Sequence, residues 1–292
     1  MAYPFNSATL LGCGEKEIAI DGIQTFIVPL HNNIIGTSSE KYFPLMFCEI
    51  GLELELNPDA LVHSADAGTF QYQISNMAYH AQLITFSSSV NEALNSMVLS
   101  SGLFINAVCW NSQMIPVGAG SQNVLISQKY KSVKSILWSF SLPKGADVKV
   151  RTLARIHNDI TSYKIRAGSK ILPQCGSVNG GPLASQCAEF LTELFKASGD
   201  LNNSMHTGII NSDNFASDDS SLISCGRAIY GMDFDSFSGR AGRIENGLSL
   251  YSNSPLYIDY TSVSQAGCNM YVHICYDALF AIRPDGSLIV SC

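Results

Sequence analysis

The stretch KYFPLMFCEIGLELEL, Lys41–Leu56, decides the predicted fold, together with TFQYQISNMAYHAQLITF at Thr69–Phe86. The first stretch is apolar from Tyr42 to Cys48 and alternates leucine with glutamate after Gly51. This pattern predicts one long strand, buried on both faces at its start and half exposed at its end. The second stretch is rich in Tyr, Phe, Ile and Thr, which predicts a strand pair or a bent long strand. Neither stretch places a catalytic group in a plausible setting, so both favour antiparallel β-structure with buried apolar faces.

The composition indicates a β-protein whose surface is largely covered. The 292 residues suffice for one large all-β unit or two packed ones. Hydrophobic residues make up 46% and charged residues only 14% of the chain, whereas about a quarter charged is usual. No apolar run reaches the roughly 18 residues of a membrane span. Other copies of the same protein are the simplest cover for such a surface.

The charge balance and the N-terminus exclude two further classes. The formal net charge is -7 and the pI is about 5.3, which disfavours nucleic-acid binding as the main role because phosphate contacts require a basic face. The first residues, MAYPFNSATLLGCGEKE, lack the basic leader and apolar core of a secretory signal.

Two helices are predicted, one in each half of the chain. Ser87–Gly102 has serines at its start, glycine at its end and one apolar face, formed by Val90, Leu94, Met97 and Val98. Pro182–Ser198 has proline in its first turn and Gly199 beyond its end. Its apolar face is formed by Leu183, Cys187, Phe190, Leu191, Leu194 and Phe195.

The other periodic segments predict strands separated by turn-forming residues. They are Ile23–Leu30, Leu103–Trp110, Asn123–Gln128, Ser132–Leu142, Ser162–Pro173 (two short strands around Ala167-Gly168), Arg227–Phe234, Pro255–Tyr260, Met270–Ile282 and Ser287–Val290. Arg283–Gly286 joins the last two as a hairpin, and Asp200–Ser221 has the composition of a long surface loop. The expected fold class is therefore all-β, in two β-rich halves that meet near Ser141–Ile160.

One pair of side chains invites a catalytic interpretation. His273 and Cys275 alternate with apolar residues on a predicted strand and share one of its faces, so a Cys-His dyad or a metal pair is conceivable. No nearby loop supplies an orienting carboxylate. Packing of both residues in the strand core is the favoured interpretation.

Acidic and glycine-rich segments raise two more sites, each with a simpler alternative. Asp233, Asp235 and Glu245 could hold Ca²⁺, but the ligand loop DxDxDG is absent and the acidic residues of the polar loop are scattered. Solvated loop residues or a helix cap are favoured. Gly176, Gly180 and Gly181 precede the second helix, where anions can bind, but the GxGxxG order is missing, which favours a loop and cap.

The nine cysteines are odd in number and show no CxxC spacing. They favour free, buried thiols in a reducing compartment over a zinc site, which needs paired ligand spacing. Trp110 and Trp138 lie within predicted strands, where core packing is the default and interface contact the second interpretation. No catalytic residue, metal ligand or cofactor site is therefore assigned.

In their order and character these segments resemble the major capsid proteins of viruses built on the double jelly roll. The matching pieces are FIVPL, IIGTSSEKYFPLMFCEIGLELEL, YQISNMAYHAQLITF before a short helix, KSVKSILWSF, YKIRAGSKILP, an amphipathic helix before INSDNF, AIYGMDFDSF, ENGLSL and YDALFAIRPDGSLIV. The resemblance covers nearly the whole chain. The family includes polinton-like viruses, virophages, adenovirus-like hexons and several bacteriophages.

The resemblance implies a hexon-like subunit with two jelly rolls side by side, at residues 1–150 and 151–292. Only about twenty residues precede FIVPL, so the strands before residue 141 fall short of the usual eight. Either the first roll is minimal, or the chain is the C-terminal portion of a longer or split subunit.

The resemblance further implies assembly partners. Three subunits would form a pseudo-hexagonal capsomer, and capsomers would tile an icosahedral shell over an internal membrane or genome. The expected partners are other copies, neighbouring capsomers and minor capsid or penton proteins, without sequence-specific nucleic-acid binding. The expected location is the virion capsid, assembled in the host cytoplasm or nucleus, and the expected role is structural, not enzymatic.

A second hypothesis keeps a β-sandwich but makes it a carbohydrate-binding or adhesin module. Such a module needs exposed aromatic side chains on one loop cluster. Only Tyr251 and Tyr257 are in reach of that role. An enzyme ranks only third among the hypotheses, because the chain offers no cluster of polar residues suited to catalysis.

Overall fold

The computed structural model describes a β-rich chain. It covers residues 23, 25, 27, 43–54, 73–141, 155–199, 201, 210–216, 226–235, 247–250, 255–264, 267–285 and 287–292. Its strands are β1 (Leu103–Val117), β2 (Gln122–Ile126), β3 (Val133–Ser141), β4 (Ile160–Ala167), β5 (Lys170–Leu172), β6 (Val178–Asn179), β7 (Ile229–Asp233), β8 (Leu256–Ser262), β9 (Cys268–Ile282) and β10 (Leu288–Ser291). Its helices are α2 (Ser88–Ser101), the 3-10 turn η2 (Ala184–Gln186), α4 (Ala188–Ser198) and α5 (Ser212–Ala216). The predicted all-β class is confirmed.

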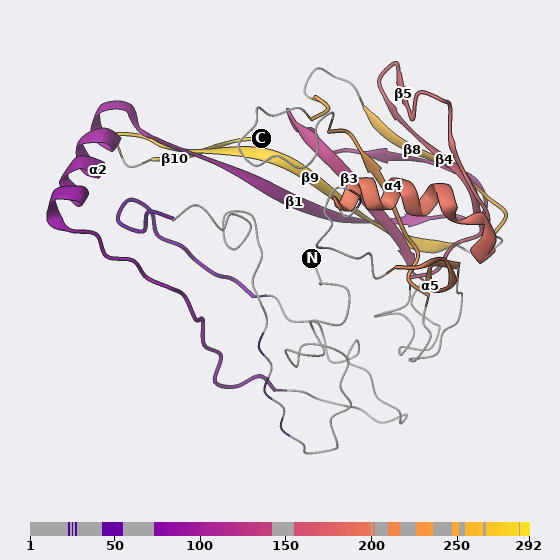
Figure 1. The fold of residues 1–292 in the computed structure, drawn as a ribbon, viewed down its shortest axis with the longest axis horizontal. Coiled ribbons are helices and arrows are strands. Elements are labelled where there is room, and N and C mark those ends of the chain that lie inside the picture. Colours follow the sequence, from indigo (N-terminus) through magenta and orange to yellow (C-terminus); the bar gives the residue numbers. More distant parts are fainter. Residues whose placement is uncertain are drawn as a thin grey trace.

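The strands form two antiparallel sheets with the connectivity of a jelly roll (Figure 1). The first sheet has the order β1-β9-β3-β7, with β10 also beside β9, and the second has the order β2-β8-β4-β5, with β6 also beside β4. From β1 to β4 successive strands alternate between the sheets, and β7, β8 and β9 alternate back. This winding places the first and last long strands side by side, as in a jelly roll of two Greek keys.

The predicted division into residues 1–150 and 151–292 stays a prediction, and the described strands lie on both sides of residue 150. β1, β2 and β3 precede residue 150 and β4 to β10 follow it, yet strands from both groups lie in each sheet. The two groups therefore build one sandwich and share one core. The physical reason is that β3 pairs with β7 and β9, and β2 pairs with β8, across this boundary.

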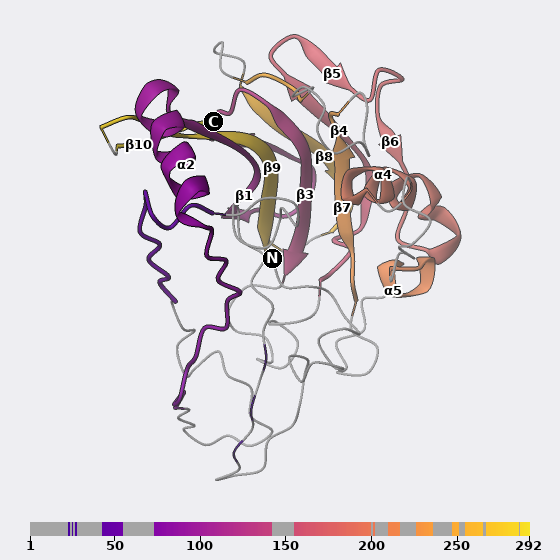
Figure 2. The same ribbon diagram turned by 60° about the vertical axis from the view of Figure 1, so that its left-hand side comes forward.

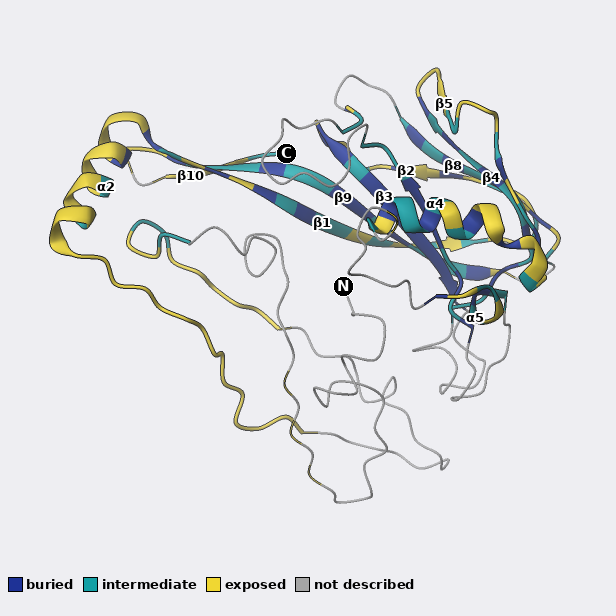
Figure 3. Ribbon diagram, viewed as in Figure 1, coloured by how far each residue is buried: buried dark blue, intermediate teal, exposed yellow. Residues whose placement is uncertain are grey.

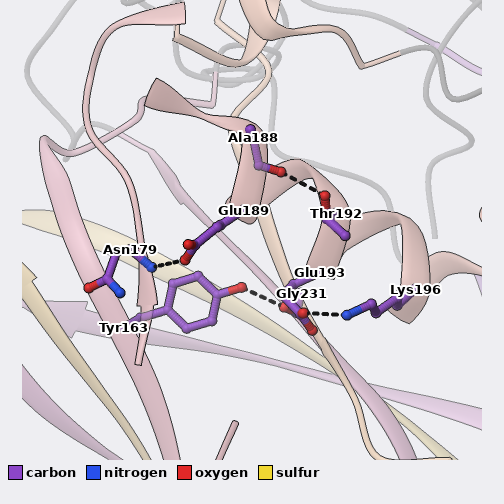
Figure 4. A network of polar contacts seen from close by, with 8 residues as sticks. All are labelled: Tyr163, Asn179, Ala188, Glu189, Thr192, Glu193, Lys196 and Gly231. Atoms are coloured by element: carbon purple, nitrogen blue, oxygen red, sulfur yellow. Dashed lines mark hydrogen bonds and ion pairs between the residues drawn. The ribbon is translucent and has the colours of Figure 1, made fainter. Parts of the chain in front are cut away.

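An aromatic cluster fills the space between the sheets. The ring centroids of Trp138 on β3 and Tyr163 on β4 are 4.8 Å apart in an edge-to-face contact. The Tyr163 hydroxyl donates a hydrogen bond of 2.8 Å to the carbonyl oxygen of Gly231 on β7 (Figure 4). These contacts connect the second sheet to the first in the middle of the core.

The helix α4 closes the side of the sandwich next to β7 (Figures 1 and 2). Phe190 and Leu194 of the predicted apolar face are buried, as is Ala197, whereas the predicted Leu183 is 60% exposed. Gly199 ends the helix with a left-handed φ of 83°. The α-helix begins at Ala188, after η2, and not at the predicted Pro182. Glu189 accepts a hydrogen bond of 2.7 Å from the Asn179 backbone, which links α4 to β6 (Figure 4).

Beyond the sandwich, β1 and β9 continue as an arm (Figure 1). They pair over 15 residues each, from Leu103 opposite Ile282 to Val117 opposite Cys268. β3 leaves β9 at Tyr276, and β10 takes its place on the same side of β9 further along. We use "arm" for this ribbon of β1, β9 and β10. α2 lies at its tip (Figures 1 and 2).

Most predicted strands are confirmed, and both predicted helices are present with shifted ends. The hairpin at Arg283 is confirmed as well, with its backbone N–H bonded to the Ser287 carbonyl at 2.9 Å. The first predicted strand, Ile23–Leu30, lies largely outside the described residues.

The two stretches that decided the prediction are not strands where they are described. Residues 43–54 contain a turn and irregular backbone, and residues 73–87 are irregular up to the start of α2. Their sequences have strand character, but a strand also needs a neighbour for its backbone N–H and C=O groups. Neither stretch pairs with any strand that the structure describes, so the prediction was wrong there.

The tight packing of α4 on β7 gives a direct test of this architecture. A Cβ atom at Gly231 would lie 2.8 Å from the Ala197 Cβ and 2.9 Å from the Leu137 Cδ2. We expect Gly231→Ala to destabilise the fold by about 1–3 kcal/mol through overpacking, measured by urea unfolding.

The matched control is Gly51→Ala, because no heavy atom lies within 4 Å of the added Cβ there. We expect this variant to change stability by less than about 0.5 kcal/mol. Equal stability of both variants and the parent would contradict the described contact between α4 and β7.

Candidate assembly surfaces

The arm carries apolar side chains that the described chain covers only in part (Figure 3). Near its tip, Val98, Ile105 and Ile282 form a small cluster, against which Phe47 and Cys48 pack. Phe104 stays 62% exposed, and β10 exposes all its apolar residues. An edge strand with this composition is unusual for a free monomer, because charges or proline normally protect such edges.

The irregular stretches leading to α2 add further uncovered apolar surface (Figure 3). Leu83 is 76% exposed and Met77 64% exposed, and the same is true to a lesser degree of Ile74, Tyr79, Ile84 and Phe86. Leu52 and Leu54 are exposed in the earlier stretch. Contiguous apolar surface of this kind marks contact sites.

A second surface lies on the outer face of the sheet β2-β8-β4-β5. The strand register aligns Leu125, Tyr257, Arg166 and Ile171 in one row across the four strands. Arg166 lies 4.7 Å from the centroid of the Tyr257 ring and forms two hydrogen bonds with Asp259. Leu125 is 50% and Ile171 45% exposed. We call this row of four residues the cross-strand row.

The cross-strand row has the chemistry of a protein contact. Tyr and Arg are enriched at the centres of interfaces, and Asp259 holds the guanidinium of Arg166 in place over the ring. From the sequence alone Tyr257 was a candidate binding aromatic, and its three neighbours in the row were not identified. The sequence signal was present in the alternation of each strand, but only the register brings the four side chains together.

The geometry does not form the Cys-His dyad considered for His273 and Cys275. His273 Nδ1 lies 2.7 Å from the Ser112 hydroxyl, and burial lowers the pKa of His273. Burial raises the pKa of Cys275 to about 12, so its thiol is protonated and not nucleophilic at neutral pH. Cys275 is buried on β9, whereas His273 is only partly buried.

Of the acidic residues considered for Ca²⁺, Asp233 and Asp235 lie within the described residues. The Asp233 carboxylate accepts a hydrogen bond of 2.9 Å from the Asp235 backbone N–H, and burial raises its pKa. Asp213 lies in α5, while Glu245, Asp218 and Asp219 lie outside the described residues. Within the described ranges, His, Cys, Asp and Glu form no group of three or more that could hold a metal ion.

Gly180 and Gly181 of the glycine-rich loop lie against protein side chains, whereas no heavy atom lies within 4 Å of a Cβ at Gly176. A Cβ at Gly180 would lie 2.4 Å from Phe190, and one at Gly181 would lie 2.2 Å from Gln186. Gly180 and Gly181 therefore permit close packing of the loop on η2 and α4.

The expected burial of the thiols holds for four described cysteines, Cys109, Cys187, Cys268 and Cys275, whereas Cys48 and Cys292 are partly exposed and Cys175 is exposed. The seven cysteines that the structure describes are free, and burial raises the pKa of Cys109 and Cys268 to about 11. Trp138 is fully buried in the core, and Trp110 is partly buried beside it. For the carbohydrate-binding hypothesis, Arg166 occupies a face of Tyr257 that a sugar would need, and Tyr251 lies outside the described residues.

A buried histidine joins α4, α5 and β7 in the core. The ring of His157 contacts the rings of Phe190, Phe215 and Tyr230 at 5.5 to 6.0 Å between centroids. Its backbone carbonyl accepts a hydrogen bond of 2.8 Å from the Tyr230 hydroxyl. Burial lowers the pKa of His157 from 6.5 to about 4, while the charge of Asp159 acts in the opposite direction.

This histidine predicts a defined loss of stability in acid. Because the folded pKa is depressed, its unfolded state takes up a proton first as the pH falls. The contribution of His157 to the free energy of unfolding is complete above pH 6.5 and is lost as the pH falls from 6.5 to 4. The loss is on the order of 3 kcal/mol. We expect His157→Phe to remove this part of the pH dependence in thermal unfolding. A variant with the slope of the parent would contradict the assignment.

Among known proteins, the matches to this chain are all solved structures. No family model matches the sequence. No curated protein matches it either. No helix in the described part of the chain is both long and apolar enough to cross a membrane.

The matching solved structures are double jelly-roll major capsid proteins of viruses. The chain is similar to PBCV-1 VP54, fitted into a reconstruction of the virophage Sputnik, at 10% identity and a TM-score of 0.40 over 66% of this chain and 52% of that one. The Faustovirus major capsid protein is 10% identical, with a TM-score of 0.41 over 66% of this chain and 36% of that one. The PM2 bacteriophage major capsid protein is 7% identical, with a TM-score of 0.32 over 60% of this chain and 45% of that one. The chain spans about half the length of these structures or less.

Proposed function

We propose that the chain is a structural subunit of a viral capsid that works by self-association. The resemblance in its sequence and the jelly-roll strand order support this role. A fold alone does not establish a function, because one fold hosts many. The observation that carries the proposal is the uncovered apolar surface of the arm and of residues 73–87.

This surface makes association favourable by an ordinary hydrophobic term. Covering a large exposed apolar side chain contributes roughly 1–2 kcal/mol at about 25 cal/mol per Å². Phe104, Leu83 and Met77 are more than half exposed, so their joint burial would offset part of the entropic cost of association. The low share of charged residues, 14%, reduces the desolvation cost of such burial.

In the proposed shell, three copies form a pseudo-hexagonal capsomer, and capsomers tile an icosahedral particle. The arm and the cross-strand row supply two chemically different contacts, one apolar and one of mixed character. Minor capsid or penton proteins are further partners, and the virion capsid is the proposed location. None of these contacts requires a cofactor or a catalytic residue.

The direct test is the mass of the purified chain by light scattering, with negative-stain images of the same sample. We expect trimers with a pseudo-hexagonal outline. A compact monomer that persists at micromolar concentration would overturn the proposed function.

The contribution of the cross-strand row can be tested by a single charge. We expect Leu125→Lys to weaken self-association by about tenfold or more, because an ammonium group would be desolvated at the contact. Sedimentation velocity over a range of concentrations measures the change.

The matched control is Ser185→Lys, which adds the same charge at an exposed position of η2. Its association should equal that of the parent. If both variants associate like the parent, the cross-strand row is not part of the contact.

A further inference from the structure

The arm leaves one position of the first sheet open. β10 lies on the same side of β9 as β3, so the two occupy successive positions along it. β7 flanks β3 on the outside, but no strand of the described chain flanks β10. The first sheet is therefore four strands wide in the sandwich and one strand narrower in the arm (Figures 1 and 2).

The outer edge of β10 is suited to receive a strand. Leu288, Ile289 and Val290 are 46%, 37% and 49% exposed. The 4-residue strand LIVS holds no charged residue and no proline, the devices by which natural edges avoid pairing. Backbone N–H and C=O groups on this edge can bind an extended chain by β-augmentation.

The chain also contains a strand without a sheet, residues 73–86, which we call the donor segment. It has β-forming residues such as Ile74, Tyr79, Ile84 and Phe86 and no Asp, Glu, Lys or Arg. Its residues are exposed and belong to no helix or strand. An uncharged segment without secondary structure and an unprotected edge complement each other in backbone hydrogen bonding and in apolar character.

The position of α2 directs the donor segment away from its own edge. Val98, near the C-terminal end of α2, is buried against Ile105 and Ile282 at the arm. The donor segment joins the opposite end of this 14-residue helix, about 21 Å along the helix axis. From there it runs away from β10 (Figures 1 and 2). A neighbouring copy is therefore the better source of a strand for this edge.

We propose that the donor segment of one copy adds as a strand to the outer edge of β10 in a neighbouring copy. This inference rests on the proposed function, because it names the contact through which copies associate. The donor and the edge are different surfaces, so the contact is head-to-tail and closes into a ring when the rotation permits. The added strand restores the four-strand width of the first sheet in the arm.

Two variants separate the partners of this contact. Ile84→Pro removes a backbone N–H and fixes φ in the donor segment, and Ile289→Lys places a charge on the edge. Each alone should weaken association by about tenfold or more in sedimentation velocity, with thermal unfolding of the monomer unchanged. Ile50→Pro, in the other exposed irregular stretch, is the matched control and should associate like the parent.

Mixing the two variants gives the decisive result. The intact donor segment of Ile289→Lys can enter the intact edge of Ile84→Pro, but the complex offers no further working pair. We expect a 1:1 dimer in the mixture and monomers in each separate sample. Absence of that dimer would overturn the inference. Association of either variant like the parent would overturn it too, but if the parent forms trimers the proposed function would still hold.

A peptide measurement keeps the inference testable if the parent itself remains a monomer. A labelled peptide of residues 73–86 with two lysines at each end should bind the parent and Ile84→Pro but not Ile289→Lys, by fluorescence anisotropy. Binding of this pattern would support strand addition while the proposed function fails. No binding to any of the three would overturn the strand addition as well.

Discussion

A β-strand is stable only where neighbouring strands satisfy its backbone hydrogen bonds. β9 provides this pairing for three other strands, β1, β3 and β10. β1 occupies one side of it over its full length, and β3 and β10 share the other side. Where β3 is the neighbour, the sheet packs against β2, β8 and β4 and a core forms. Where β10 is the neighbour, no second sheet lies opposite among the described strands, and the ribbon becomes an arm.

The local elements of this fold are predictable from sequence because their causes are local. The alternation in β8 and in the first half of β9 matches their burial patterns. The apolar residues of α4, followed by Gly199, predict a helix that ends where it does. The pairing of strands is not local. Nothing near residue 150 indicates that β3 pairs with β7 and β9.

The difference between local and non-local causes also explains why the strands predicted at residues 43–54 and 73–87 are not found. It explains as well why only one residue of the cross-strand row was identified from the sequence. The composition of a segment indicates that it can form a strand, but it forms one only where a neighbouring strand pairs with its backbone. Tyr257 could be selected from sequence as an aromatic of interest, whereas Arg166 above it comes from a different strand and is visible only through the register. At Cys275 burial alone disfavours a reactive thiol, because it raises the pKa of the group.

The winding of the sandwich also has a consequence for the order of events during synthesis. β1 and β3 leave the ribosome well before β9, their shared neighbour, and they cannot complete their hydrogen bonds until residues 268–282 have been made. Such non-local pairing slows folding, and unpaired apolar strands in the waiting chain are prone to aggregation. The nascent chain therefore carries exposed strand edges through most of translation, and a folding helper that shields β1 and β3 would act before the last strands emerge.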